Sequence, residues 1–197
     1  MLNNFRESLK PHLEKLGNRF ATTGLSPNFW ATLGLVFAFL SSIAYGLNQQ
    51  IQFAAIIGGV LLLVSGFFDV VDGQVARATK KISKKGGFLD SVFDKVAEVT
   101  IFAGLLVGGF AQPIWILLAI TLSLLVSYAR SRAESLGIKL QGIGIGERAE
   151  RLLVIALIGM IPGLMPYAIG IVIAISGITF VQRIMVTSKN ITENGSV

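Results

Sequence analysis

Long apolar stretches separated by short polar segments make up most of this chain. Several stretches are nearly free of charge and approach the ~20 residues with which an α-helix crosses a bilayer. Because backbone polar groups in lipid must be satisfied within their own segment, such stretches favour helices. We therefore expect an all-α polytopic membrane protein, a single domain over residues 1–197, with six transmembrane helices at about 28–47, 53–78, 88–109, 114–133, 150–161 and 167–185.

The N-terminal segment has a different, amphipathic pattern. Apolar side chains recur at helical spacing between residues 2 and 20, and basic side chains lie on the other faces. Such a helix is suited to the plane of the membrane interface, with its apolar side buried. We expect an N-terminal amphipathic interfacial helix over residues 1–22. The alternative is an ordinary solvated helix.

The amino-acid composition supports a membrane protein and excludes several kinds of functional site. The chain is 53% hydrophobic and 14% charged, whereas a soluble domain is about 25% charged, and its mean hydropathy is +0.71. It has no cysteine and one histidine, His12, which excludes disulfides, thiol chemistry and a histidine-rich metal site. The net charge of +6 favours anionic headgroups and phosphorylated substrates as partners, with no nucleic acid expected.

Basic residues are distributed asymmetrically about the six stretches. All 17 Lys and Arg lie in the N-terminal segment, in the second-to-third or fourth-to-fifth connections with their flanks, or in the C-terminal region. The three intervening turns contain none. The positive-inside rule therefore predicts a multi-pass protein of the cell membrane with both termini and both charged connections in the cytoplasm.

Four aspartates gather at two of these predicted helix ends. Asp69 and Asp72 are spaced i, i+3, and Asp90 and Asp94 are spaced i, i+4, so each pair lies on one helical face. A short connection makes the two helices antiparallel neighbours, and both pairs can point into one cleft. Clustered carboxylates need protons or cations between them, and all-oxygen ligands suit Mg²⁺, Mn²⁺ or Ca²⁺.

Neighbouring residues indicate that a phosphate group shares these cations. Gly73 permits close approach to the backbone, Ala76 keeps the same face small, and Arg77 offers a planar donor fork for phosphate oxygens. The alternative is a buried ion-pair network of the aspartates with Arg77 and Lys95 that only joins the helices.

The chain contains the pattern D-x2-D-G-x2-A-R-x8-G-x3-D-x3-D, from Asp69 through Gly86 to Asp94. This pattern resembles the signature of the CDP-alcohol phosphotransferases. The resemblance implies that a CDP-linked lipid donates a phosphatidyl-type group to an alcohol and releases CMP, with two divalent ions, Mg²⁺ or Mn²⁺. It also implies a homodimer.

Residue roles follow from the same resemblance. It implies Asp69, Asp72, Asp90 and Asp94 as metal ligands, and Asp94 also as the catalytic general base. It implies Asp69, Asp72, Gly73, Ala76 and Arg77 as the CDP-binding residues. A PN-x3-T pattern similar to one in this family adds Asn28 and Thr32; the alternative for these two is a plain helix start.

The connection between the fourth and fifth stretches indicates the acceptor. The segments SYARSRAESLGI and GIGERAERLLVI resemble the branch of the family that uses inositol 1-phosphate. That acceptor needs a cationic pocket for its phosphate, and the candidates are Arg130, Arg148 and Arg151, ahead of Arg132, Lys139 and Arg183. The alternative is basic residues present only as positive-inside charge. The N-terminal block is most similar to archaeal members, which implies CDP-archaeol and an archaetidyl product rather than a diacyl one.

Other functions stay open at this point. The same chemistry could use glycerol 3-phosphate, serine or inositol as acceptor. A membrane prenyltransferase also combines paired aspartates with Mg²⁺ and diphosphate. A cation transporter would need acidic residues near the middle of the membrane, whereas here we expect them at one end of the spans.

Overall fold

The computed structural model describes residues 2–140 and 142–194, with side chains from residue 11 to 191 within them. These residues form seven helices and no strand. The expected all-α fold is therefore confirmed. The helices are α1 (Leu2–Ala21), α2 (Pro27–Gly46), α3 (Ala54–Ala78), α4 (Lys84–Val107), α5 (Pro113–Ser135), α6 (Arg148–Gly159) and α7 (Met165–Asn194).

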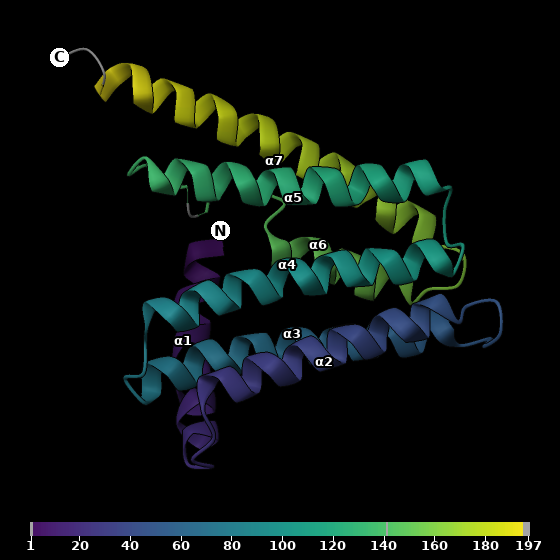
Figure 1. The fold of residues 1–197 in the computed structure, drawn as a ribbon, viewed down its shortest axis with the longest axis horizontal. Helices are drawn as coiled ribbons and strands as arrows, with labels where there is room; N and C mark the ends of the chain where they lie inside the picture. Colours follow the sequence, from purple (N-terminus) through teal and green to yellow (C-terminus); the bar gives the residue numbers. More distant parts are fainter. Residues whose placement is uncertain (1, 141, 195–197) are drawn as a thin grey trace.

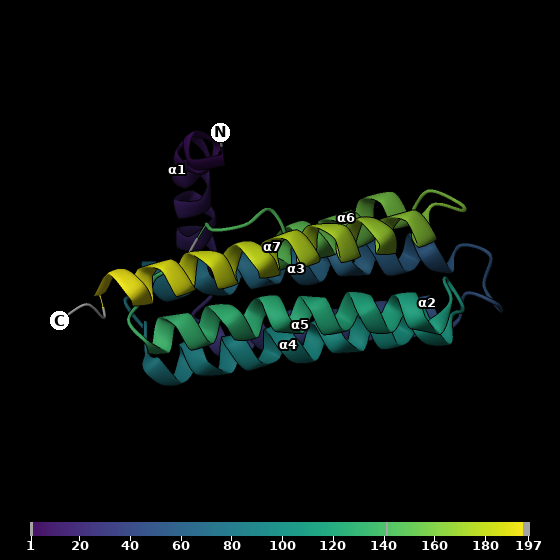
Figure 2. The same ribbon diagram turned by 90° about the horizontal axis from the view of Figure 1, so that it is seen from above.

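Six helices, α2 to α7, form a bundle, and α1 crosses one end of it (Figure 1). Seen from above, α2, α4 and α5 make one layer, and α3, α6 and α7 make the other (Figure 2). The close packing contacts run α2–α3, α3–α6, α6–α7, α7–α5, α5–α4 and α4–α2, which closes a ring. The order of the helices around the ring therefore differs from their order along the chain.

This ring corrects one expectation about the aspartate-bearing helices. We predicted that α3 and α4 are antiparallel neighbours, but each packs closely against α2 rather than against the other. Helix α2 is rich in small residues, including the buried Gly34, Ala38 and Ser41, so two helices can approach it closely. Between the ends of α3 and α4, space is left for a site.

Four helices are long and apolar enough to cross a membrane: α2, α3, α5 and the Met165–Ile191 part of α7. Helix α4 carries several charged residues in its first half. Helix α6 has 12 residues, which at 1.5 Å per residue is about 18 Å, well short of a bilayer core. The structure thus supports a membrane protein with four clear candidate spans.

Two helix boundaries differ from the predicted ranges by four residues or more. Helix α4 begins at Lys84, not near residue 88, because Ser83 caps it: the Ser83 Oγ accepts from the Gly86 N–H at 3.0 Å. Gly86 therefore lies in the first helical turn rather than in a loop before it. Helix α7 extends from Met165 to Asn194, beyond the predicted end at 185.

Helix α1 packs on α3. Its described apolar residues Leu16 and Phe20 contact the buried cluster of Trp30, Val71 and Val75, and the rings of Phe20 and Trp30 meet edge to face at 5.0 Å. This part of the predicted apolar face therefore contacts protein. The remaining part, in residues 1–10, lies outside the described side chains.

The contact between α2 and α4 is one backbone against another. The Ser42 Oγ donates to the Thr100 carbonyl at 2.6 Å, and a Cβ added at Gly104 would overlap the Ser42 carbonyl oxygen. Close approach of small residues is the usual way in which membrane helices associate. Gly104 thus sets the spacing of the two helices that border the aspartate site.

We predict that Gly104→Ala lowers the thermal stability of the detergent-solubilised protein. Overpacking of this kind costs about 1–3 kcal/mol. Gly66→Ala is the matched control, since a Cβ there meets nothing within 4 Å and alanine favours a helix by about 1 kcal/mol over glycine. Equal melting temperatures for the two variants would show that the α2–α4 spacing does not depend on Gly104.

Candidate active site

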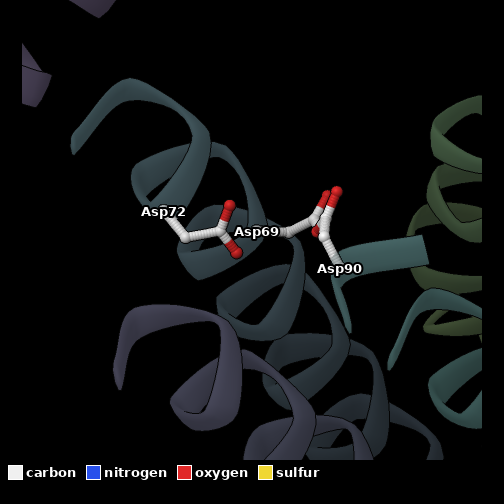
Figure 3. Close-up of side chains that lie close together, drawn as sticks. All are labelled: Asp69, Asp72 and Asp90. Carbon is white, nitrogen blue, oxygen red and sulfur yellow. The ribbon is translucent and has the colours of Figure 1, made fainter. Parts of the chain in front are cut away.

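Three carboxylates converge where the end of α3 faces the start of α4. One oxygen from each of Asp69, Asp72 and Asp90 lies within 4.8 Å of the others. The carboxylates of Asp69 and Asp90 lie together, and that of Asp72 points toward them (Figure 3). The Asp72 Oδ2 is buried and has no hydrogen-bond partner among the described residues. An all-oxygen set with an unpartnered buried oxygen fits a hard divalent cation.

The fourth aspartate is held by an arginine. The Asp94 Oδ1 lies 2.6 Å from the Arg148 Nη1, and the same nitrogen lies 3.0 Å from the Asp69 Oδ1. Arg148 is the first residue of α6, so α6 reaches the carboxylates of both α3 and α4. The sequence-based alternative of an ion-pair network named Arg77 and Lys95, whereas the ion pairs of the aspartates recorded among the described residues involve Arg148.

A first cavity, of about 210 Å³, lies on one side of the three carboxylates. Of the predicted CDP-binding residues, it is lined by Asn28, Asp72, Gly73, Ala76 and Arg77. A Cβ at Gly73 would meet nothing within 4 Å, so the backbone there is open.

Two predicted CDP-binding residues lie apart from this lining. Asp69 instead lines a third, much smaller pocket, together with Asp72, Asp90 and Asp94. The Thr32 hydroxyl donates to the Asn28 carbonyl at 2.8 Å, a bond that threonine commonly forms within a helix.

A second cavity, of about 530 Å³, lies between α4, α5, α6 and α7. It is lined by Asp90, Asp94 and several cationic side chains: Lys95, Arg130, Arg148, Arg151 and Arg183. Arg130 forms an exposed ion pair with Glu134, with the Nε and Oε1 atoms 2.8 Å apart. Because Asp90 lines both cavities, the aspartate cluster lies between two chambers.

Arg151 is engaged differently from the other two predicted acceptor arginines. Its side chain is 1% exposed, and its Nε and Nη2 donate to the Glu98 Oε1 at 2.9 and 2.6 Å. Its Nη1 donates to the Gly146 carbonyl at 2.6 Å. The guanidinium is thus bound to protein groups on two sides, which the sequence did not indicate.

Glu98 also corrects an expectation about charge. It is fully buried near the middle of α4, whereas we expected the acidic residues at one end of the spans. The pairing with Arg151 neutralises it, so it is not a free acidic site of the kind that a cation pathway needs.

Residues 142–147, which precede α6, have no helical structure and are hydrogen-bonded to α7. The Thr179 Oγ1 accepts from the N–H groups of Ile145 and Gly146, at 3.2 and 2.9 Å. The Arg183 Nε donates to the Ile143 carbonyl at 3.1 Å. Non-helical backbone within a membrane protein is tolerated where protein groups form hydrogen bonds with its N–H and C=O groups. Residues of α7 therefore hold the start of α6, and with it Arg148, at the depth of the aspartates.

The fold and the site define a helical membrane enzyme that handles phosphorylated substrates. The chain belongs to the CDP-alcohol phosphatidyltransferase family, whose sequence profile matches residues 25–188. It is 36% identical over 193 residues to an archaetidylinositol phosphate synthase of Pyrococcus horikoshii, covering 97% of this chain and 98% of the relative. It is 37% identical over 190 residues to the synthase of the same name from Methanothermobacter thermautotrophicus, covering 94% and 93%.

Solved structures share the fold. A Mycobacterium tuberculosis phosphatidylinositol phosphate synthase with CDP-DAG bound superposes with a TM-score of 0.74 at 24% identity, covering 89% of this chain and 92% of that one. The same synthase in complex with manganese and citrate gives a TM-score of 0.75 at 23% identity, covering 89% and 88%.

We predict that Asp69→Asn, Asp72→Asn and Asp90→Asn each weaken Mn²⁺ binding by about tenfold or more. Removal of a residue that only hydrogen-bonds to a metal ligand typically lowers metal affinity about tenfold to a hundredfold, and removal of the ligand itself should lower it at least as much. Titration of the purified protein, followed by electron paramagnetic resonance of free Mn²⁺, measures this directly. Glu14→Gln, on α1, is the control for removal of an acidic charge. An affinity unchanged in all three variants would exclude the cluster as a metal site.

Proposed function

We propose that this protein transfers an archaetidyl group from CDP-archaeol to inositol 1-phosphate and releases CMP, in phospholipid biosynthesis. The observation that carries the proposal is the position of Asp90 and its neighbours between two cavities, each of which contains cationic side chains. A transferase with two phosphorylated substrates needs such a pair of chambers. The two archaeal relatives that align over nearly the whole chain support the choice of substrates.

The donor occupies the smaller cavity in this proposal. The open backbone at Gly73 admits the nucleotide diphosphate, and Arg77 binds its phosphate oxygens. Asp69, Asp72 and Asp90 hold divalent cations, Mg²⁺ or Mn²⁺, and Asp94 is predicted to join them. When bound, these cations neutralise charge that develops on the diphosphate.

The acceptor occupies the larger cavity, with its phosphate near Arg130 and Arg148. These two arginines line the chamber that Asp94 also faces. Arg151 was predicted in the same role. Its pairing with Glu98 favours a supporting function instead, because each of its three nitrogen atoms already donates to a protein group.

The main contribution of the protein to the reaction is then to position the two substrates and the Asp94 carboxylate. A hydroxyl oxygen of the acceptor attacks the phosphorus that bears the lipid, and Asp94 takes the hydroxyl proton. The new phosphorus–oxygen bond replaces the bond to the CMP phosphate, and CMP leaves with the electron pair. Arg148 holds Asp94 at 2.6 Å, which fixes the direction in which the carboxylate can accept the proton.

We further propose that all six helices of the ring cross the membrane and that the site faces the cytoplasm. Helix α6 would cross together with the non-helical segment before it, and α4 with its charged end at the interface. The three turns at the opposite end of the bundle, 47–53, 108–112 and 160–164, carry no charged residue, which supports this orientation. Helix α1 would lie at the cytoplasmic interface. The homodimer stays a prediction.

We predict CMP release from CDP-archaeol with inositol 1-phosphate in the presence of Mg²⁺ or Mn²⁺, and little release with glycerol 3-phosphate, serine or inositol. Asp94→Asn is the blank: it should bind CDP-archaeol but not turn over. Faster release with another acceptor would keep the reaction and change the substrate. Cation flux in proteoliposomes without any CMP release would instead support a transporter.

We predict that Arg130→Ala and Arg77→Ala affect different substrates. Because a hydrogen bond to a charged group is worth about 1.5–3 kcal/mol, Arg130→Ala should raise the KM for inositol phosphate tenfold or more and leave the KM for CDP-archaeol unchanged. Arg77→Ala should do the reverse. Arg132→Ala is the matched control, since this exposed arginine on the same helix bonds Ser135. An equal effect of Arg130→Ala and Arg132→Ala would contradict the acceptor site.

A further inference from the structure

Helices α4 and α6 are connected by two ion pairs, one above the other. On α4, Asp94 and Glu98 are four residues apart, and on α6, Arg148 and Arg151 are three apart, so each pair of side chains shares a helical face. Arg148 binds Asp94 at 2.6 Å, and Arg151 binds Glu98 at 2.6 Å. The two helices are not closely packed backbone to backbone. These long side chains therefore span the distance between them.

The two ion pairs differ in their surroundings. The outer pair borders the aspartate cluster, with Arg148 17% and Asp94 24% exposed. The inner pair is closed to solvent, with Arg151 1% and Glu98 0% exposed. Breaking a buried pair leaves an uncompensated charge in a low-dielectric interior. We therefore expect the inner ion pair to stay formed throughout the reaction, whereas the outer ion pair is accessible to substrates.

Arg151 also holds the start of its own helix. The first turn of α6 has no side-chain cap at Glu147, and the Arg151 Nη1 donates to the Gly146 carbonyl, two residues before Arg148. A guanidinium can donate hydrogen bonds to Glu98 and Gly146 at the same time because its donors form a planar fork, whereas the ammonium of a lysine is a single point charge. One side chain thus joins α4 to the backbone from which Arg148 projects.

We propose that Glu98 and Arg151 are a positioning pair for the reaction. Their buried ion pair fixes the height and rotation of α6 on α4 and so holds the Arg148 Nη1 between Asp69 and Asp94. Glu98 lines neither cavity, and each nitrogen atom of Arg151, which borders the larger cavity, donates to a protein group. Their effect is transmitted by Arg148, which orients the Asp94 carboxylate toward the acceptor cavity. This inference rests on the proposed function in one respect, namely that Asp94 accepts the proton of the acceptor.

The experiment is a double-mutant cycle between Glu98→Gln and Arg148→Ala, with CMP release as the readout. Glu98→Gln alone should lower kcat by about tenfold to a hundredfold, the usual cost of losing a group that orients a functional one. The KM for CDP-archaeol should change less than about twofold, since the donor cavity is lined neither by Glu98 nor by any residue of α6. In the Arg148→Ala background, Glu98→Gln should lower kcat by no more than about twofold, because the residue through which it acts is absent.

A second variant separates positioning from stability. Glu98→Leu with Arg151→Met removes both buried charges, which typically restores stability, so its melting temperature in detergent should approach that of the wild type while its kcat stays low. Arg151→Lys keeps the charge and loses the fork, and should recover part of the activity that Arg151→Met loses. Ser41→Ala, which removes a buried hydrogen bond between α2 and α3, controls for a general loss of stability.

Two outcomes would overturn the proposal. Additive effects of Glu98→Gln and Arg148→Ala would mean that Glu98 does not act through Arg148. Wild-type turnover in the doubly apolar variant would mean that the pair only stabilises the fold. An error in the proposed acceptor can be distinguished from an error in the positioning proposal. In that case the wild-type protein would release CMP with another alcohol, and the double-mutant cycle would be run with that alcohol.

Discussion

The structure is built around the neutralisation of carboxylates inside a membrane protein. Four aspartates gather at one end of the bundle, and carboxylates this close together repel one another unless cations or protons lie between them. Arg148 supplies one positive charge, to Asp69 and Asp94, and the arrangement of Asp69, Asp72 and Asp90 suits cations for the rest. Much of the fold serves this balance. Helix α2 separates α3 from α4, and α7 holds the start of α6 at the depth of the aspartates.

The same arrangement explains why the site has two chambers. Three carboxylates occupy the gap between α3 and α4, so a ligand reaches them from the α2 side or from the α5–α7 side. The α2 side is narrow and presents open backbone at Gly73. The other side is wider and cationic. A substrate that brings a diphosphate and a substrate that brings a phosphomonoester are thus separated by charge and size, and meet only at the aspartates.

Much of this could be predicted from local sequence patterns. Hydropathy located the helices because the apolar stretches are long, and the aspartate pairs were visible because each lies on one helical face. Three features depend on long-range contacts and could not be predicted. The path of residues 143–147 along α7 relies on Thr179 and Arg183, which lie more than thirty residues downstream in the chain. The partner of Arg151 is Glu98, on another helix. The separation of α3 from α4 follows from the ring. The start of α4 is different, since Ser83 was an available capping signal.

The difference between chain order and ring order has a consequence for biosynthesis. Helices α2, α3 and α4 are made first and carry all four aspartates. The arginine that balances two of them belongs to α6 and is made more than fifty residues after Asp94. During translation, the nascent membrane protein therefore holds an acidic cluster without its arginine. Helix α6, too short to cross a bilayer by itself, then has an electrostatic reason to enter the ring. Its insertion supplies the missing positive charge, and the packing of α7 against α5 and α6 then closes the ring and completes the active site.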